Sequence, residues 1–165
     1  MSKLKVNVAG CPDREAARLI RIAAKAAYYA MDYAFDAQVD MLITDDPGIR
    51  EYNRTFRDCD TATDVLSFPL QDFYRGHSPV MPELLADADS GSVMLGDIVI
   101  SAQRARAQAK EFGHGFPREC VYLTVHSMLH LLGYDHTDEG EEKAAMRARE
   151  EAVLKKLGLD RPVFG

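Results

Sequence analysis

The sequence predicts an α+β fold, in which about five helices pack on a small mixed β-sheet of about four strands. Short apolar or alternating stretches bounded by glycine, proline or aspartate are typical of strands. Longer stretches with apolar residues three or four positions apart are typical of helices. One of these stretches, residues 117–132, is apolar nearly all round, so we expect it to form a central, buried helix.

Two strands and two helices are expected in the first third of the chain. Polar–apolar alternation predicts the strands, and proline or aspartate at a helix start predicts where the helices begin. In order, these are a strand over 3–8, a helix from Pro12 to about Ala34, a strand over 39–44, and a helix over 47–56 capped by Asp45 or Asp46.

The remaining elements follow from the same signals. Gly96 interrupts a strongly apolar strand and marks a bulge or a close backbone approach. In order, we expect a polar loop over 57–64, a strand over 65–68 closed by Pro69, a surface excursion over 70–92 with a helical turn at 83–85, a strand over 93–100, a helix from Ser101 to Gly113, the helix that begins at Pro117, and a last helix with Asp138, Glu139, Glu141 and Glu142 at its start and Lys155, Lys156 and Gly158 at its end.

Length and composition suit one soluble globular domain over residues 1–165. The chain is 47% hydrophobic and 28% charged, and no apolar run approaches the ~20 residues of a membrane span. The N-terminus lacks the apolar core of a signal peptide. Cys11, Cys59 and Cys120 are odd in number and widely spaced, which indicates a reducing cytoplasm. The net charge of −6 argues against non-specific coating of nucleic acid, but it allows a nuclease with a local positive cleft.

The eleven residues 126–136, HSMLHLLGYDH, predict a metal site. His126 and His130 are four apart and share one helix face, about 5–6 Å apart at Cβ. Gly133 can end the helix in a left-handed conformation, so the chain turns back and His136 can deliver a third nitrogen. A lone histidine is usually a satisfied core or surface residue, but three of the five histidines fall in this run. Three imidazoles leave a fourth position open, as catalytic zinc sites do.

The same spacing is the zincin-like frame of metzincin proteases, which place a glutamate base after the first histidine. Ser127 occupies that position and cannot hold a proton near neutral pH. Asp135 is a possible substitute, although a supporting or capping role beside His136 is at least as plausible. Peptide hydrolysis is therefore disfavoured.

Phosphodiester cleavage needs, beyond a metal-activated water, a cation for the phosphate oxygens. Arg57 is the candidate for this cation; the alternative is that it is a solvated loop arginine.

Two alternatives are open for each of the other polar candidates. Thr63 and Asp64 either form the turn that starts a strand or support the site. Asp97 orients either a histidine or its own strand. The other two histidines, His77 and His114, are expected to lie in loops and to take no part in the site. A structural zinc would need a fourth protein ligand, and none is spaced suggestively nearby.

Run 126–136 resembles the signature of the bacterial YbeY family of rRNA maturation factors. Three further stretches resemble the family in the same order along the chain, 52–57 (YNRTFR), 63–69 (TDVLSFP) and 95–101 (LGDIVIS). The family commonly has glycine where Ser127 stands, and the segment 70–92 is longer and more acidic than is usual in the family.

This resemblance implies a single-strand-specific metal-dependent endoribonuclease that acts in 16S rRNA 3′-end maturation and 70S ribosome quality control. It implies one zinc ion on His126, His130 and His136, with Arg57 and His126 as catalytic residues. Its partners would be single-stranded RNA, rRNA and the small ribosomal subunit, with no membrane or DNA partner. The alternatives are a zinc metallopeptidase, and a non-catalytic ribosome assembly factor with a structural zinc.

Overall fold

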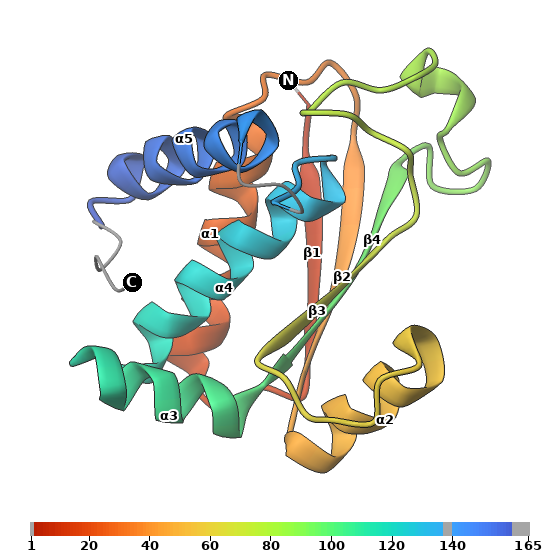
Figure 1. Cartoon of the computed structure of the whole chain (residues 1–165). Coiled ribbons are helices and arrows are strands. Elements are labelled where there is room, and N and C mark those ends of the chain that lie inside the picture. The colour runs from red at the N-terminus through yellow and green to blue at the C-terminus, as the bar shows by residue number, and fades with distance from the viewer. Residues whose placement is uncertain (1, 137–139, 160–165) are drawn as a thin grey trace.

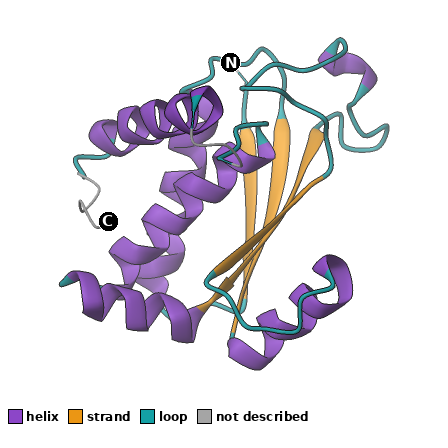
Figure 2. Cartoon of the chain, in the orientation of Figure 1, coloured by secondary structure: helices purple, strands orange, loops and turns teal. Residues whose placement is uncertain are grey.

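The computed structural model describes residues 2–136 and 140–159, and it confirms the α+β class (Figures 1 and 2). Asp138 and Glu139, expected to open the last helix, lie outside the described residues. The elements are β1 (Leu4–Ala9), α1 (Arg14–Tyr29), β2 (Ala37–Thr44), α2 (Asp46–Arg57), β3 (Val65–Pro69), the 3₁₀ turn η1 (Pro82–Leu84), β4 (Val93–Ser101), α3 (Ala102–Phe112), α4 (Phe116–Leu131) and α5 (Glu141–Lys156).

The four strands form one mixed sheet in the order β1-β2-β4-β3. Strands β1, β2 and β4 are parallel, and β3 lies antiparallel to β4 at the edge. The predicted irregularity at Gly96 is confirmed as a bulge: Gln38 lies opposite Met94, but Val39 lies opposite Gly96. Gly96 has φ +146°, and a Cβ there would lie 2.3 Å from the carbonyl oxygen of Phe68. Only glycine therefore fits at position 96, where β3 pairs closely with β4.

Helices α1, α3, α4 and α5 cover one face of the sheet, and α2 covers part of the other (Figure 1). Helix α4 contacts α1, α3, α5, β3 and β4, and 11 of its 16 residues are buried. The prediction of a central, buried helix at this position is confirmed. Because α4 is held on so many sides, side chains that leave it toward β3 have fixed positions.

Helix α1 differs from the sequence expectation at both ends. It begins at Arg14 with the Asp13 side chain as its N-cap, and it ends at Tyr29 and not near Ala34. After the helix, Tyr33 and Phe35 stack against each other with ring centroids 4.6 Å apart. Both rings also approach Tyr28, so packing of this aromatic group takes the chain off the helix axis although the alanine-rich spacing continues.

The excursion over residues 70–92 is more than a surface loop. It contains η1 where a helical turn was expected, but its first part packs into the molecule. Phe73 is buried, and the backbone N–H groups of Arg75 and Gly76 donate to the carbonyls of Gly133 and Leu132. The excursion therefore braces the turn that follows α4. In the described parts of the chain, no helix combines the length and apolarity needed to cross a membrane.

Replacing Ser127 by alanine is expected to stabilise the protein. The Ser127 hydroxyl is buried in α4 and makes no hydrogen bond to any part of the chain that the structure describes. A buried unsatisfied hydroxyl costs stability, and alanine is the better helix former. We expect the free energy of unfolding to rise by about 1 kcal/mol and the Tm by about 2–4 °C, measured by thermal denaturation.

Ser101→Ala is the matched control, and it is expected to change the free energy of unfolding in the opposite direction. The Ser101 hydroxyl is equally buried, but it accepts from the Arg104 backbone N–H at 3.3 Å and donates to Asp46 at 2.6 Å. Its loss should lower the free energy of unfolding by about 1 kcal/mol. Equal effects of the two substitutions would contradict this account of the α4 interior.

Candidate metal centre

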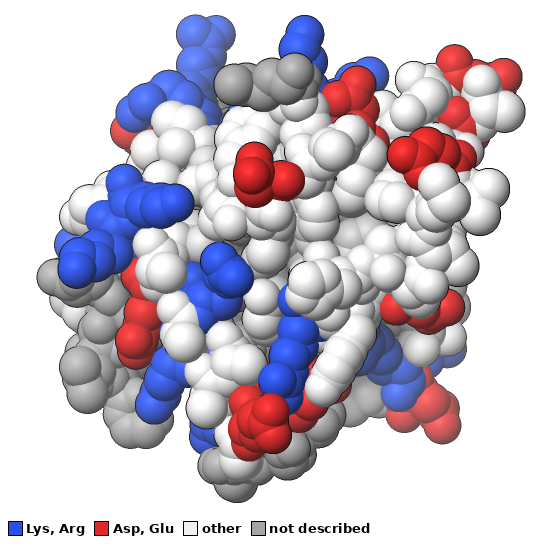
Figure 3. Space-filling model, turned by 90° about the horizontal axis from the view of Figure 1, so that it is seen from above, with Lys and Arg blue, Asp and Glu red and all other residues white. Residues whose placement is uncertain are grey.

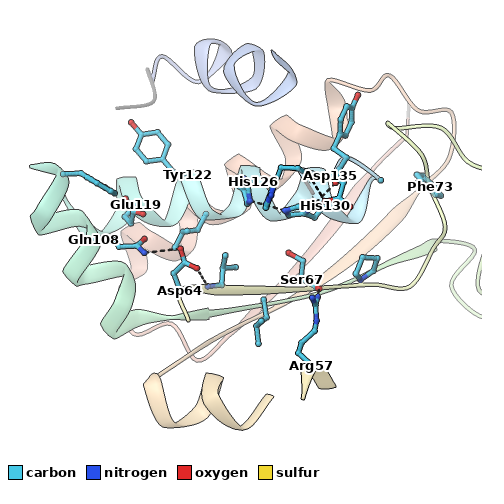
Figure 4. A pocket seen from close by; sticks show the side chains of 18 residues that line it. Arg57, Asp64, Ser67, Phe73, Gln108, Glu119, Tyr122, His126, His130 and Asp135 are labelled. Atoms are coloured by element: carbon cyan, nitrogen blue, oxygen red, sulfur yellow. Dashed lines mark hydrogen bonds between the residues drawn. The ribbon is translucent and has the colours of Figure 1, made fainter. Parts of the chain in front are cut away.

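A cleft of about 850 Å³ runs between α4 and β3. Its walls come from α4, from β3 and the residue before it, from α3, from the end of α2 and from the turn after α4 (Figure 4). All three candidate histidines line it, together with Arg57, Asp64 and Asp135. The structure thus brings most of the predicted site residues to one cavity.

The three histidines converge as the sequence predicts. His126 and His130 leave the same face of α4, with ring centroids 4.7 Å apart. Gly133, at φ +89°, turns the chain back, and the His136 ring lies 5.3 Å from that of His126 and 4.9 Å from that of His130. One nitrogen from each ring can be chosen so that all three atoms lie within 4.8 Å of one another. The cluster can therefore hold a metal ion.

The hydrogen bonds made by the Nδ1 atoms of His126 and His130 indicate that the cluster suits a cation. The Nδ1 of His130 lies 3.1 Å from the Tyr134 carbonyl oxygen, and the Nδ1 of His126 lies 3.0 Å from Glu150 Oε2. Both oxygens accept, so in the neutral rings both Nδ1 atoms carry the proton and both Nε2 atoms carry lone pairs. These two Nε2 atoms are 3.1 Å apart. Two lone pairs at that distance repel each other, and a shared cation turns the repulsion into coordination.

Protonation of His130 is strongly disfavoured. Burial lowers the pKa of His130 to about 4, with further lowering from His126 and His136. The hydrogen bond to the Tyr134 carbonyl acts in the opposite direction but is weaker. At neutral pH the ring is therefore neutral, the form in which imidazole binds metals.

Glu150 is a site residue that the sequence interpretation missed. It comes from α5, its side chain is only 5% exposed, and it is the partner of His126 Nδ1. A carboxylate in this position fixes the ring and raises its basicity toward a metal. One signal was present: on α5, Glu150 shares the inward face with Met146, Val153 and Leu154, where a charged residue needs a partner.

The turn after α4 is held by close packing against the excursion and by hydrogen bonds. A Cβ on Gly133 would lie 2.1 Å from the Phe73 carbonyl oxygen, so glycine is required there. The Asp135 carboxylate accepts from the His136 backbone N–H at 2.7 Å. Asp135 thus orders the backbone that carries the third histidine, which agrees with the supporting role, one of the two considered for it.

Arg57 is the last residue of α2 and not a loop residue as expected. It reaches over the edge of β3, where its Nη2 donates to the Ser67 carbonyl oxygen and its guanidinium lies 5.3 Å from the centre of the Phe68 ring. In Figure 4 its head points up toward the histidines from the opposite wall. Among the described residues this is its one hydrogen bond, which uses one of five guanidinium N–H donors, so the group can also bind an anion in the cleft.

Asp64 lines the cleft, whereas Thr63 stands behind it. The Asp64 carboxylate accepts from the Val65 backbone N–H at 2.8 Å, from the Thr63 hydroxyl at 3.3 Å and from Gln108 Nε2 at 3.2 Å. Asp64 therefore starts β3 and also joins it to α3. Thr63 and Asp64 thus form the strand-start turn, and the Asp64 side chain also lines the cleft, so a supporting role in the site stays a prediction.

Asp97 is not brought to the histidines. It lies in a separate groove of about 470 Å³ together with Asp40 and Phe68, on the side of the sheet that carries α2. The alternation of β4 sends Ile98 and Ile100 into the main core, whereas Val99, which shares the Asp97 face, packs with Ile49 of α2. Burial, and then the neighbouring Asp40, raise the pKa of Asp97. Of the two roles considered for it, orienting a histidine is wrong.

His114, expected to take no part in the site, is part of a buried pair. Its Nε2 lies 2.7 Å from Glu119 Oε1, and both side chains are at most 8% exposed. Glu119 lines the cleft seven residues before His126 on α4. The pair fixes the α3–α4 turn, and the sequence interpretation missed both members. His77, in contrast, is exposed, and within the described residues its hydrogen bonds are backbone bonds with Tyr74.

An α+β fold with three convergent imidazoles and an arginine on the facing wall defines the candidate site of a metal-dependent hydrolase. The family model described as Endoribonuclease YbeY matches residues 5–158. With that match, the chain belongs to the endoribonuclease YbeY family.

Relatives and a solved structure agree with this membership. An endoribonuclease YbeY of Clostridium botulinum (strain Loch Maree / Type A3) is 47% identical over 133 residues, covering 76% of this chain and 78% of the relative. One from Caldanaerobacter subterraneus is 46% identical over 143 residues, covering 87% and 88%. The solution structure of TM1509 from Thermotoga maritima matches with a TM-score of 0.56 at 21% identity, over 94% of this chain and 91% of that one. This last likeness shows the fold alone.

Replacing Glu150 by glutamine is expected to weaken zinc binding by about tenfold, because an amide orients the His126 ring less firmly and adds no basicity. Competition with a chromophoric chelator measures the affinity. Glu151→Gln, an exposed neighbour on the same helix, is the control and should bind zinc as the wild type does. Equal affinities for the two variants would show that Glu150 does not support the metal ligand.

Proposed function

We propose that this member of the endoribonuclease YbeY family is a single domain that cleaves single-stranded RNA with one zinc ion held by His126, His130 and His136. The observation that carries the proposal is the pair of Nε2 lone pairs facing each other at 3.1 Å in a cleft that also contains Arg57. Lewis-acid activation of a water and of a phosphoryl oxygen is the chemistry that a divalent ion on these histidines supplies.

The protein's own side chains supply position and charge. Glu150 and the Tyr134 carbonyl hold the rings of His126 and His130, so neither turns as substrate enters. Arg57 faces them from the end of α2 and stabilises the negative charge that develops on the phosphate oxygens. Arg57 is exposed, and its bond to the Ser67 carbonyl holds the guanidinium at the cleft.

The distribution of charge favours one approach for RNA. The excursion carries four exposed acids, Asp72, Glu83, Asp87 and Asp89, against one arginine, Arg75. Acidic side chains gather at the right of Figure 3, the side on which Figure 1 places the excursion, whereas basic side chains lie mostly toward the left and centre. A polyanion is therefore expected to enter from the side away from the excursion.

The biological role follows from the family. We assign the protein to 16S rRNA 3′-end maturation and 70S ribosome quality control in the cytoplasm, with the small ribosomal subunit as its partner. The three cysteines are free thiols, which agrees with a reducing compartment. Maturation of 16S rRNA in a strain that depends on this protein, with the His126→Ala variant as comparison, tests the assignment.

Neither alternative function explains the cleft as well. A metallopeptidase of this frame needs a base after the first histidine, and Ser127 is fully buried and does not line the cleft. A structural zinc needs a fourth protein ligand, and in the described part of the chain the ligand group has three members. The open side of the group faces the cavity that Arg57 lines.

Replacing Arg57 by alanine should lower kcat/KM for an unstructured RNA by about 100-fold, as loss of one charge-stabilising donor does, with zinc content unchanged. Cleavage of a fluorescently labelled oligonucleotide and elemental analysis of the same samples measure both quantities. Arg54→Ala is the matched control, since Arg54 lies on the same helix but pairs with exposed Glu51. Chelator-insensitive cleavage, or equal rates for both variants, would contradict the proposed chemistry.

A further inference from the structure

The cleft continues past the histidines toward the N-terminal end of α4, into a region that the proposed chemistry does not use. Side chains of α3, α4 and the start of β3 line it there (Figure 4). They are Asp64, Gln108, Phe112, Glu119 and Tyr122. Because Glu119 precedes His126 by seven residues, this end lies about 10 Å from the metal ligands along the helix axis. A nucleotide neighbouring the cleaved phosphodiester would fall there.

The side-chain amide of Gln108 has a fixed orientation at this end. Asp64 Oδ2 lies 3.2 Å from Gln108 Nε2, and Asp64 is itself anchored by the Val65 backbone N–H and the Thr63 hydroxyl. A carboxylate only accepts, so the amide nitrogen must face it. Gln108 makes no other side-chain hydrogen bond to the described residues. Its carbonyl oxygen and second N–H are thus available to a ligand in the cleft.

The surroundings of Gln108 select the kind of ligand. Asp64 places a carboxylate in the wall, whereas the Glu119 carboxylate is buried and paired with His114. The Asp64 charge repels a phosphate and leaves the RNA backbone to the Arg57 side. Phe112 lines the same wall, and unpaired bases stack on aromatic side chains of this kind. The remaining carbonyl oxygen and N–H of the Gln108 amide can pair with any base edge that presents a donor beside an acceptor. The neighbouring Asp64 carboxylate decides between such edges, because it attracts an exocyclic amine and repels a carbonyl oxygen.

We propose that this end of the cleft is a nucleobase subsite in which Gln108, oriented by Asp64, prefers an amino base, adenine or cytosine, over a keto base, uracil or guanine. The proposal rests on the proposed endoribonuclease activity and adds a base preference at a fixed distance from the cut. Gln108 is a specificity residue and takes no part in the reaction itself.

The test uses the zinc-loaded full chain and short oligouridine RNAs that carry one adenine, cytosine or guanine at each position in turn. Cut positions and kcat/KM are measured for wild type, Gln108→Ala and Gln103→Ala. Gln103 lies on the same helix, but its side chain accepts from the Asp46 backbone N–H and lies outside the cleft. We expect wild type and Gln103→Ala to cleave RNAs with adenine or cytosine at one offset about tenfold faster than those with uracil or guanine there. In Gln108→Ala this ratio should fall close to one.

The possible failures are distinguishable. Efficient cleavage by wild type with equal rates for all four bases at every offset overturns the subsite and leaves the ribonuclease proposal standing. A ratio that survives in Gln108→Ala also overturns the role of Gln108. If the zinc-loaded wild type cleaves none of the RNAs, the ribonuclease proposal fails, and the subsite fails with it.

Discussion

Two imidazole nitrogens that both carry lone pairs face each other across 3.1 Å at the middle of the cleft. The protons are held on the far side of each ring by acceptors, the Tyr134 carbonyl for His130 and the Glu150 carboxylate for His126. A shared cation turns the repulsion between these lone pairs into coordination. Much of the remaining structure serves to hold those rings where only a shared positive charge makes them compatible.

Several elements maintain the arrangement from different directions. Burial of α4 on most sides fixes the first two histidines, and α5 delivers Glu150 from behind. The excursion packs its backbone against Gly133 and so sets the path to His136. The absence of a Cβ at Gly96 allows β3 to approach β4 closely. Arg57 is bonded to the Ser67 carbonyl of β3 and so faces the histidines across the cleft. The metal site and the anion site thus come from separate parts of the fold.

Local patterns in the sequence predicted the parts of the site that are local. The four-residue spacing places His126 and His130 on one face of the helix, and Gly133 predicts the turn that leads to His136. The group of three metal ligands was therefore predictable from the sequence. Glu150 lies 24 residues from His126 and comes close only through packing of α5 on α4. The two roles of Asp97 stayed open because a strand residue has two possible faces, and only the register with β2 and the packing of α2 decide between them. The His114–Glu119 pair likewise depends on how α3 meets α4.

X-ray absorption at the zinc edge of the wild-type protein, loaded with one equivalent of zinc, tests the central claim most directly. The account predicts scattering from three imidazole nitrogens at ~2.0–2.1 Å and one further light atom that exchanges with added anions. A sulfur ligand, a fourth protein ligand that does not exchange, or an ion bound without imidazole scattering would contradict it.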